Sequence, residues 1–341
     1  MKVGLVGYQG SGKSSLFEWL TGTPADPSLA HASQHAMATV RDPRVADLCE
    51  IYRPKKITEA ALEIFDTAGL ARSHQGNAAR LSQIREADCL VHVIGVFGGA
   101  VPKVDMQSFM EDLLLADLEI VTGRVERLRE ALRKPRPDRE EQQVELQALE
   151  PLLARLEEGQ PIDPSSLTDD QQKVTRSFRL LTQKRRMVLI NLPDDGQASE
   201  YESLATADVP VVCLPVGLEL ELSRMAPDER EAFREEMGVA SFDRDGLIRA
   251  LMSLSGQMLF FTAGEKEVRT WMVRQQATAV EAAGSIHTDL ARGFIRAEVM
   301  RCEDLVRLGS ERDLKAAGLN RQEPKDYVLQ DGDILNIRFS V

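Results

Sequence analysis

The chain has 341 residues, of which 43% are hydrophobic and 28% are charged, and its formal net charge is −12. This length allows two or three domains, and no apolar stretch approaches the roughly 20 residues that span a bilayer. The negative charge argues against nonspecific coating of nucleic acid, so we expect neither DNA nor a membrane as a partner. The N-terminal residues lack a signal-peptide pattern, and four scattered cysteines lack metal-ligand spacing, which predicts a cytoplasmic protein.

The first predicted element is a buried strand at residues 2–6 that leads into a glycine-rich loop. The loop, Gly7 to Ser14, matches the pattern G-x-x-x-x-G-K-[ST], and a helix-compatible stretch follows at residues 15–20. Backbone N–H groups in such a loop turn toward phosphate oxygens, while Lys13 bridges the β- and γ-phosphates and the Ser14 hydroxyl ligates Mg²⁺. The nucleotide-binding residues predicted here are Gly10, Ser11, Gly12, Lys13, Ser14 and Ser15.

A second strand is predicted at residues 61–65, and it ends in the D-x-x-G sequence Asp66-Thr67-Ala68-Gly69. Asp66 is expected to hold Mg²⁺ through water, and the Gly69 N–H is expected to meet the γ-phosphate. Leu70 follows where many GTPases carry a glutamine that orients the attacking water, and an apolar side chain cannot do this. The predicted catalytic residues are Lys13, Asp66, Gly69 and, in the next loop, His74.

Three further strands, at residues 89–94, 187–191 and 209–214, predict a doubly wound α/β sheet. A long interruption separates the first two of these strands. Apolar residues recur every three or four positions at 106–132 and 144–156, which predicts an antiparallel helical hairpin inserted in the sheet. We expect the charges of the hairpin to be a solvated helix face, with a binding surface as the alternative.

The second of these strands runs into Asn191-Leu192-Pro193-Asp194, where related nucleotide sites carry the base-reading sequence N-K-x-D. The Asp194 carboxylate is expected to accept from guanine, Asn191 to bond N7 or the adenine 6-amino group, and Leu192 to cover the base. The nucleotide-binding residues predicted here are Asn191, Leu192 and Asp194.

The segment from about residue 258 predicts a small mixed sheet of the β-grasp type. Strands are expected at 260–262, 270–273 and 295–299, and a helix at 280–286. Two alternating runs within residues 327–339 flank an Asp-Gly turn and predict a hairpin.

Together these motifs resemble the YchF family of Obg-like ATPases, P-loop proteins with a helical hairpin and a C-terminal TGS domain. The stretches that carry the C-terminal resemblance are Phe261-Thr262-Ala263-Gly264, Lys266-Glu267-Val268-Arg269, Ala282 to Asp289, Gly293 to Glu298 and Gln330-Asp331-Gly332-Asp333. The resemblance implies a cytosolic, Mg²⁺-dependent ATPase that associates with ribosomes, or with RNA, through its helical and TGS-like domains. GTP is the alternative nucleotide, and we expect discrimination within about tenfold.

The chain departs from this family at several positions. Gly10 and Ser11 replace the family's Asn-Val, and the switch I threonine corresponds to Ala30, with Ser28 and Ser33 nearby. The loop that carries a catalytic histidine in the family is reduced to residues 98–102. With these departures we still expect the chain to bind nucleotide, and we expect hydrolysis of the nucleotide to be slow.

The resulting prediction is an α/β P-loop domain (1–102 and 186–256), an inserted helical hairpin (103–185) and a TGS-like domain (257–341). The leading hypothesis is a slow nucleotide-hydrolysing switch. The alternatives are a nucleotide-binding interaction module without useful hydrolysis and a P-loop kinase. Of the other histidines, we expect His92 to be a satisfied core residue and His287 to fix local structure.

Overall fold

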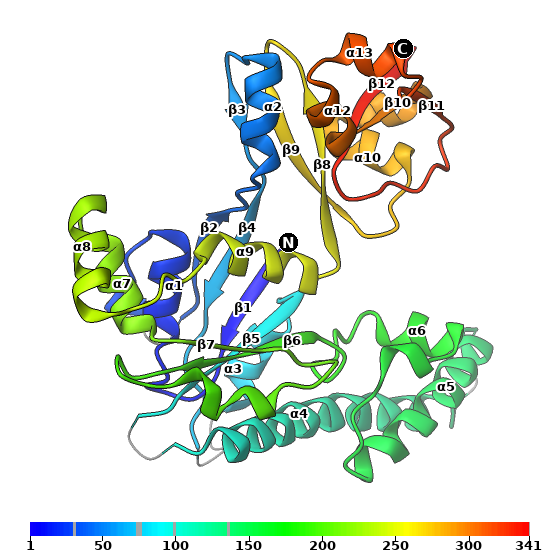
Figure 1. The fold of residues 1–341 in the computed structure, drawn as a ribbon. Coiled ribbons are helices and arrows are strands. Elements are labelled where there is room, and N and C mark those ends of the chain that lie inside the picture. Colours follow the sequence, from blue (N-terminus) through cyan, green and yellow to red (C-terminus); the bar gives the residue numbers. More distant parts are fainter. Residues whose placement is uncertain (30–31, 73–76, 98–99, 135–136, 341) are drawn as a thin grey trace. The chain divides into compact units, whose positions relative to one another are not determined.

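The computed structural model describes residues 1–29, 32–72, 77–97, 100–134 and 137–340 (Figure 1). The chain divides into two compact units, the first made of residues 1–36 and 63–242 and the second of residues 37–62 and 243–341. This division differs from the sequence-based one, because residues 37–62 and 243–256 belong with the C-terminal segment. None of the helices in the described parts of the chain is long and apolar enough to cross a membrane.

The first unit contains a six-stranded sheet in the order β2-β4-β1-β5-β6-β7. Its strands are β1 (Lys2–Val6), β2 (Gln34–Thr39), β4 (Ala61–Asp66), β5 (Cys89–Gly95), β6 (Arg185–Asn191) and β7 (Val211–Leu214). The β1–β4, β1–β5, β5–β6 and β6–β7 pairs are parallel, which confirms the predicted doubly wound α/β sheet. Parallel strands end at one edge, so the residues that follow β1, β4 and β6 are brought together there.

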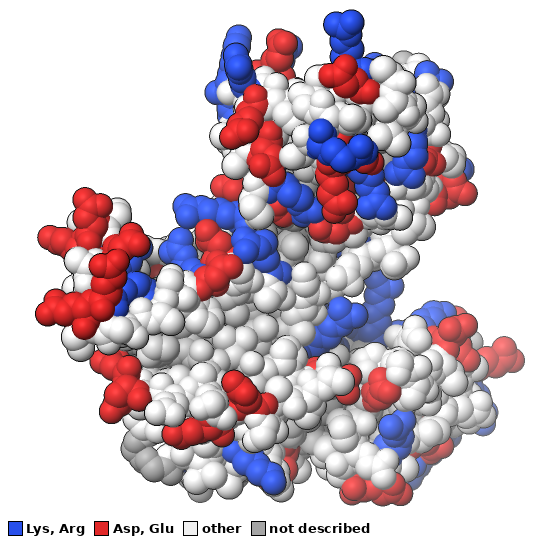
Figure 2. Space-filling view, viewed as in Figure 1, with Lys and Arg blue, Asp and Glu red and all other residues white. Residues whose placement is uncertain are grey.

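Helices cover this sheet and extend from it (Figure 1). They are α1 (Lys13–Thr21), α3 (Asn77–Ile84), α4 (Pro102–Ala131), α5 (Arg139–Glu157), α6 (Asp169–Thr175), α7 (Val216–Arg224) and α8 (Pro227–Met237). Single 3₁₀ turns lie at Pro27–Leu29, Pro164–Ser166, Ala198–Glu200 and Glu202–Leu204. Acidic side chains gather over α8 (Figure 2), where the net negative charge of the chain is most visible.

The predicted helical hairpin is α4 and α5, which share a core that includes Val121, Val125 and Leu149. Both helices begin earlier than the apolar pattern indicated, at Pro102 and Arg139. The first turns of α4 pack on the sheet rather than on α5, because Phe109 is buried against a cluster that includes residues of β1 and β4. The hairpin therefore grows out of the core of the nucleotide domain without a linker.

The second unit has its own six-stranded mixed sheet, in the order β11-β10-β12-β8-β9-β3. The strands are β3 (Ile57–Thr58), β8 (Gln257–Ala263), β9 (Val268–Arg274), β10 (Phe294–Arg301), β11 (Arg321–Glu323) and β12 (Asp333–Phe339). The helices are α2 (Arg44–Tyr52), α9 (Arg244–Leu254), α10 (Ala279–Ile286), α11 (Thr288–Arg292), α12 (Cys302–Leu308) and α13 (Glu311–Ala316). On the face shown in Figure 2, lysines, arginines and carboxylates are interspersed over this unit.

The prediction of a hairpin at residues 327–339 is wrong. β12 pairs with β10 and β8, and the preceding run makes only an isolated bridge between Val328 and Thr278. The run is held elsewhere because the Leu329 N–H donates to the Ala277 carbonyl at 2.9 Å. The Asp333 carboxylate also accepts from the Tyr327 hydroxyl at 2.9 Å, which fixes the turn as a local loop.

Residues 37–62 join the second unit through both packing and strand pairing. Leu48 of α2 is fully buried in a cluster with Phe261 and Met300. β3 pairs in parallel with β9, with Ile57 opposite Val268. A segment predicted to belong to the nucleotide domain therefore completes the C-terminal core.

Candidate functional site

The loop between β1 and α1 has the conformation of a phosphate-binding loop. Gly10 and Gly12 have φ angles of 80° and 94°, a region that side-chain-bearing residues rarely adopt. Gly12 is the N-cap residue of α1, so the first N–H groups of the helix open toward the loop. Ser15 lies in the first turn of α1 and is partly buried. The Ser11 hydroxyl is buried and has no hydrogen-bond partner among the described residues.

Asn191, at the end of β6, is hydrogen-bonded to this loop through its side chain. Its Nδ2 donates to the Ser11 carbonyl at 3.1 Å, and its Oδ1 accepts from the Val216 N–H at 3.0 Å. A Cβ atom at Gly12 would lie 2.1 Å from Asn191 Nδ2, so only glycine allows this approach. Both polar groups of the Asn191 amide are therefore engaged by the protein, which corrects the expectation that they face the base.

Lys13 places a buried cation at the mouth of the loop. Its Nζ donates to the Tyr8 carbonyl at 2.9 Å, and the residue is 6% exposed. Burial lowers the pKa of Lys13 to about 8, the Asp66 carboxylate opposes this fall, and the Arg80 guanidinium adds to it. A buried ammonium of this kind is stabilised when an anion such as phosphate arrives.

Ser14 and Asp66 form the oxygen pair that the sequence predicted for Mg²⁺. Ser14 Oγ donates to Asp66 Oδ2 at 2.5 Å, and Asp66 Oδ1 is buried without a hydrogen-bond partner among the described residues. Burial raises the pKa of Asp66, while the Ser14 hydroxyl and the Lys13 ammonium lower it. An unsatisfied carboxylate oxygen beside a hydroxyl fits a hard cation, which prefers oxygen ligands. The described residues contain no cluster of three or more His, Cys, Asp or Glu that would hold a metal without phosphates.

The D-x-x-G segment packs directly on the phosphate-binding loop. The Leu70 N–H donates to the Gly7 carbonyl at 3.0 Å, and the Gln9 N–H donates to the Leu70 carbonyl at 3.2 Å. A Cβ atom at Gly69 would lie 2.7 Å from Gln9 Cα and 3.1 Å from Lys13 Nζ, so a side chain there would collide with the loop. The Leu70 side chain is 1% exposed and packs in the core, pointing away from the site.

A cavity of about 390 Å³ opens between these two segments, and we call it the phosphate cavity. Its lining brings together Gly10, Lys13, Ser14, Asp66 and Gly69, all of which were predicted as site residues. Arg80 of α3 also lines it, and its Nη1 donates to the Gly69 carbonyl at 2.6 Å. Sequence reasoning missed Arg80 because it belongs to no motif. Its position, one helical turn into the helix after D-x-x-G, is the only signal that the sequence offers.

The residues predicted to read the base have three different surroundings. Leu192 is 5% exposed and packs with Ile94, Val188 and Ile190, because it continues the buried side of β6. This corrects the expectation that its side chain covers the base. Asp194 is exposed in the loop after Leu192.

Several predicted residues near switch I and switch II lie outside the described residues, namely Ala30, His74, Gly98 and Gly99. Of the two serines proposed as substitutes, Ser33 donates to the Gln83 side chain at 3.2 Å, and the Ser28 N–H donates to Asp26 at 2.8 Å. The hydroxyl of Ser33 is therefore engaged on α3.

The other two histidines stay outside the site. His92 is buried and stacked on Phe109 at 4.1 Å, and burial lowers its pKa to about 3. It is a core residue as expected, but it is not satisfied, since Nε2 has no partner among the described residues. His287 caps α11 by accepting from the Asp289 N–H at 3.2 Å, the local structural role that was predicted.

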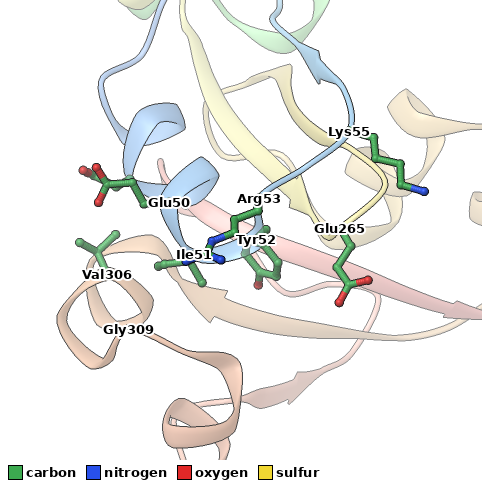
Figure 3. Close-up of a pocket in the computed structure, with 9 residues that line it drawn as sticks. Glu50, Ile51, Tyr52, Arg53, Lys55, Glu265, Val306 and Gly309 are labelled. Carbon is green, nitrogen blue, oxygen red and sulfur yellow. The ribbon is translucent and has the colours of Figure 1, made fainter.

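A larger pocket of about 720 Å³ lies in the second unit (Figure 3). It is lined mainly by α2 and the chain after it, with Glu265 contributed by the β8–β9 turn. Its lining mixes Glu50 and Glu265 with Arg53 and Lys55, and it has no phosphate-binding loop. The mixed charge of this pocket does not select an anion.

Comparison with known proteins gives matches over the whole chain. Residues 2–122 match the family model described as 50S ribosome-binding GTPase. Residues 258–340 match the model of the YchF GTPase C-terminal domain, described as a protein of unknown function (DUF933). The chain is 34% identical to the ribosome-binding ATPase YchF of Bacillus subtilis (strain 168), with 100% of both chains covered. It is also 34% identical to Obg-like ATPase 1 of Oryza sativa subsp. japonica, covering 100% of this chain and 92% of that protein. The solved structure of the Schizosaccharomyces pombe YchF GTPase is 26% identical, with a TM-score of 0.82 and coverage of 99% and 97%.

Proposed function

The chain belongs to the YchF family, and from this we propose that it is a Mg²⁺-dependent nucleoside triphosphatase that binds ribosomes and hydrolyses ATP slowly. The observation that carries the proposal is the buried Lys13 ammonium beside the Ser14–Asp66 pair in the phosphate cavity. A buried cation and an unsatisfied carboxylate oxygen suit a phosphate chain with its metal ion. The relatives named as ribosome-binding ATPases supply the partner and the nucleotide.

In this proposal Ser14 and Asp66 would hold Mg²⁺, with Ser14 as a direct ligand and Asp66 acting through water. The metal, when bound, neutralises charge on the β- and γ-phosphates. Lys13 binds the same phosphates, and the N–H groups of Gly10 and Gly12 surround them. The Gly69 N–H meets the γ-phosphate from the other side of the cavity.

Slow hydrolysis follows from the place of Leu70. The side chain is buried in the core and carries no polar atom, so it cannot orient the attacking water. The same feature favours the second candidate function, a nucleotide-binding interaction module without useful hydrolysis. The two candidates differ only in whether bound ATP is turned over.

The test is purified protein with ATP and with GTP, each with and without Mg²⁺. Affinity is measured by titration calorimetry and turnover by release of inorganic phosphate. We expect Mg²⁺-dependent binding of both nucleotides and slow release of phosphate that Lys13→Ala abolishes. Binding without any release identifies the interaction module, and no binding of either nucleotide would overturn the whole proposal.

Ribosome association is tested separately by co-sedimentation with ribosomes in the presence of ADP or of a nonhydrolysable ATP analogue. A switch is expected to sediment to different extents in the two states, because the nucleotide changes the contacts of the D-x-x-G segment. Equal sedimentation in both states would argue against a switch while leaving ribosome binding intact.

A further inference from the structure

Arg80 brings a second cation into the phosphate cavity. It lies on α3 and lines the cavity together with Lys13. Its Nη1 donates to the Gly69 carbonyl at 2.6 Å, and Gly69 in turn abuts Lys13, with 3.1 Å between Lys13 Nζ and a Cβ placed at Gly69. The guanidinium therefore lies beside Gly69, whose N–H is expected to meet the terminal phosphate.

The surroundings of Arg80 can accept an anion. No carboxylate within the described residues forms an ion pair with it, whereas Arg72 and Arg85 bind Asp105 and Asp117. Burial lowers the pKa of Lys13, the Asp66 carboxylate raises it and the positive charge of Arg80 lowers it further, so both groups act on the same ammonium. The cavity is lined by two cations, Lys13 and Arg80, and by two carboxylates, the exposed Asp26 and the partly buried Asp66. A metal ion at Asp66 would offset the charge of that carboxylate, and both cations could then interact with a polyphosphate.

The hydrogen-bonding capacity of Arg80 also exceeds its use. A guanidinium has five N–H donors in a planar fork that matches phosphate oxygens. Only the bond from Nη1 to the Gly69 carbonyl is present among the described residues. The remaining donors are free to meet phosphate while that bond keeps the side chain in place.

We propose that Arg80 is a catalytic arginine supplied by the chain itself, which binds the terminal phosphate of ATP and stabilises the charge that develops on it during hydrolysis. This inference rests on the proposed function. It supplies a group that partly compensates for the absence of a polar side chain at Leu70.

The step it assists is ordinary hydrolysis. The water oxygen forms a bond to the γ-phosphorus, and the bond from that phosphorus to the β–γ bridging oxygen breaks. The bridging oxygen leaves with the electron pair as part of ADP. One proton of the water stays on the released phosphate and the other passes to solvent. Arg80 donates hydrogen bonds to the γ-phosphate oxygens throughout and transfers no proton.

The competing explanation is that Arg80 only positions Gly69 through the carbonyl bond. The two roles differ in what they do to ground-state and transition-state complexes. A positioning residue affects ATP and a transition-state analogue alike, whereas a catalytic arginine acts mainly on the transition state.

The experiment uses the full chain with Arg80→Ala, Arg80→Gln and Arg80→Lys. The matched control is Arg129→Ala, which removes an exposed arginine that pairs with Glu150 on the helical hairpin. Single-turnover ATP hydrolysis is measured together with the affinities for ADP, for a nonhydrolysable ATP analogue and for ADP with aluminium fluoride. Thermal unfolding shows which variants are folded.

We expect Arg80→Ala and Arg80→Gln to slow hydrolysis by at least about tenfold and to weaken the aluminium fluoride complex by a similar factor. The ADP affinity should change less than about twofold, and Arg80→Lys should restore part of the rate. Should alanine and glutamine destabilise the fold, the lysine variant still decides, because it must be slower than the parent chain at equal ADP affinity.

Unchanged hydrolysis in folded variants would overturn the catalytic role. Equal losses for the ATP analogue and for the aluminium fluoride complex would also overturn it, because they identify a positioning residue. If the parent chain binds ATP but releases no phosphate, the aluminium fluoride titration alone decides. If the parent chain binds no nucleotide, the proposed function fails first, and that result is recognised in the parent before any variant is made.

Discussion

The two ends of the candidate site are built differently. At the phosphate end, Gly10, Lys13, Ser14 and Asp66 line one cavity, and Gly12 is the N-cap residue of α1 beside it. At the base end, defined by Asn191, Leu192 and Asp194, one side chain supports the loop, one fills the core and one is exposed.

The difference shows what each motif requires. The phosphate end depends on backbone geometry and on a few buried charges, which a short sequence pattern can specify. The base end depends on which way individual side chains point, and β6 decides this by alternating its residues between buried sides of the sheet. We therefore expect strong binding of phosphates and little choice between purines.

The largest effect is expected from removing the phosphate-end cation. Lys13→Ala should weaken ATP binding at least about 100-fold, roughly 3 kcal/mol, because a buried charge and three donors are lost together. Calorimetric titration measures this, and Lys103→Ala, which changes an exposed lysine on α4, is the control. An affinity for ATP that survives the change would place the nucleotide elsewhere.

The next largest effect is expected at Asn191, which connects the base end to the phosphate-binding loop. Asn191→Ala should lower the free energy of unfolding by about 2 kcal/mol, because it leaves the Ser11 carbonyl and the Val216 N–H without their partner. It should weaken ATP and inorganic tripolyphosphate equally, since its effect passes through the loop. Asn191→Asp keeps the acceptor for Val216 but places a buried carboxylate oxygen against the Ser11 carbonyl, so it should destabilise the loop at least as much as alanine does. A loss confined to ATP would show that Asn191 reads the base after all.

A smaller effect is expected from pH. The pKa of Lys13 is lowered to about 8 in the free protein by burial, and bound phosphate should raise it again. Affinity is therefore full below pH 8 and should fall as pH rises above it, by at most about tenfold per unit. Calorimetry at pH 8.5 in buffers of different ionisation enthalpy should detect proton uptake on binding. Proton release under these conditions would contradict the assignment.

The smallest effect is expected at the base end. Asp194→Ala should weaken GTP by about threefold and ATP by less, because an exposed carboxylate contributes under 1 kcal/mol. Asp195→Ala is a matched control at the adjacent exposed position. Competition between the two nucleotides measures the difference. A thousandfold preference for either nucleotide in the parent chain would contradict the inference that the base end discriminates little between purines.

Local patterns were enough to predict much of the first unit. The apolar runs of β1 and β5, the phosphate-binding loop and the apolar spacing of α4 and α5 each act within a few residues. The side-chain roles of Asn191 and Leu192 were not predictable, because they depend on contacts with residues far along the chain.

The same limit explains the errors in the second unit. Residues 327–330 have the alternation of a strand, but the Leu329 N–H donates to the Ala277 carbonyl and the Tyr327 carbonyl accepts from the Ala279 N–H, so the alternation did not identify the partner. α2 and β3 are short, and nothing in their sequence shows that α2 packs on β9 or that β3 pairs with it, about 200 residues later. Arg80 is found only once α3 is placed beside Gly69.

The membership of residues 37–62 in the second unit has a consequence for how the protein is made. The apolar face of α2, which includes Leu48, is synthesised about 200 residues before the strands β8 and β9 that cover it. At the usual rate of synthesis, about 5–20 residues per second, that face stays without its covering strands for roughly 10–40 s. The strands β4 to β7 of the first unit are synthesised during this interval, before β8 and β9. Termination of synthesis before β8 would leave the apolar face of α2 uncovered, in a form suited to aggregation or to capture by a chaperone.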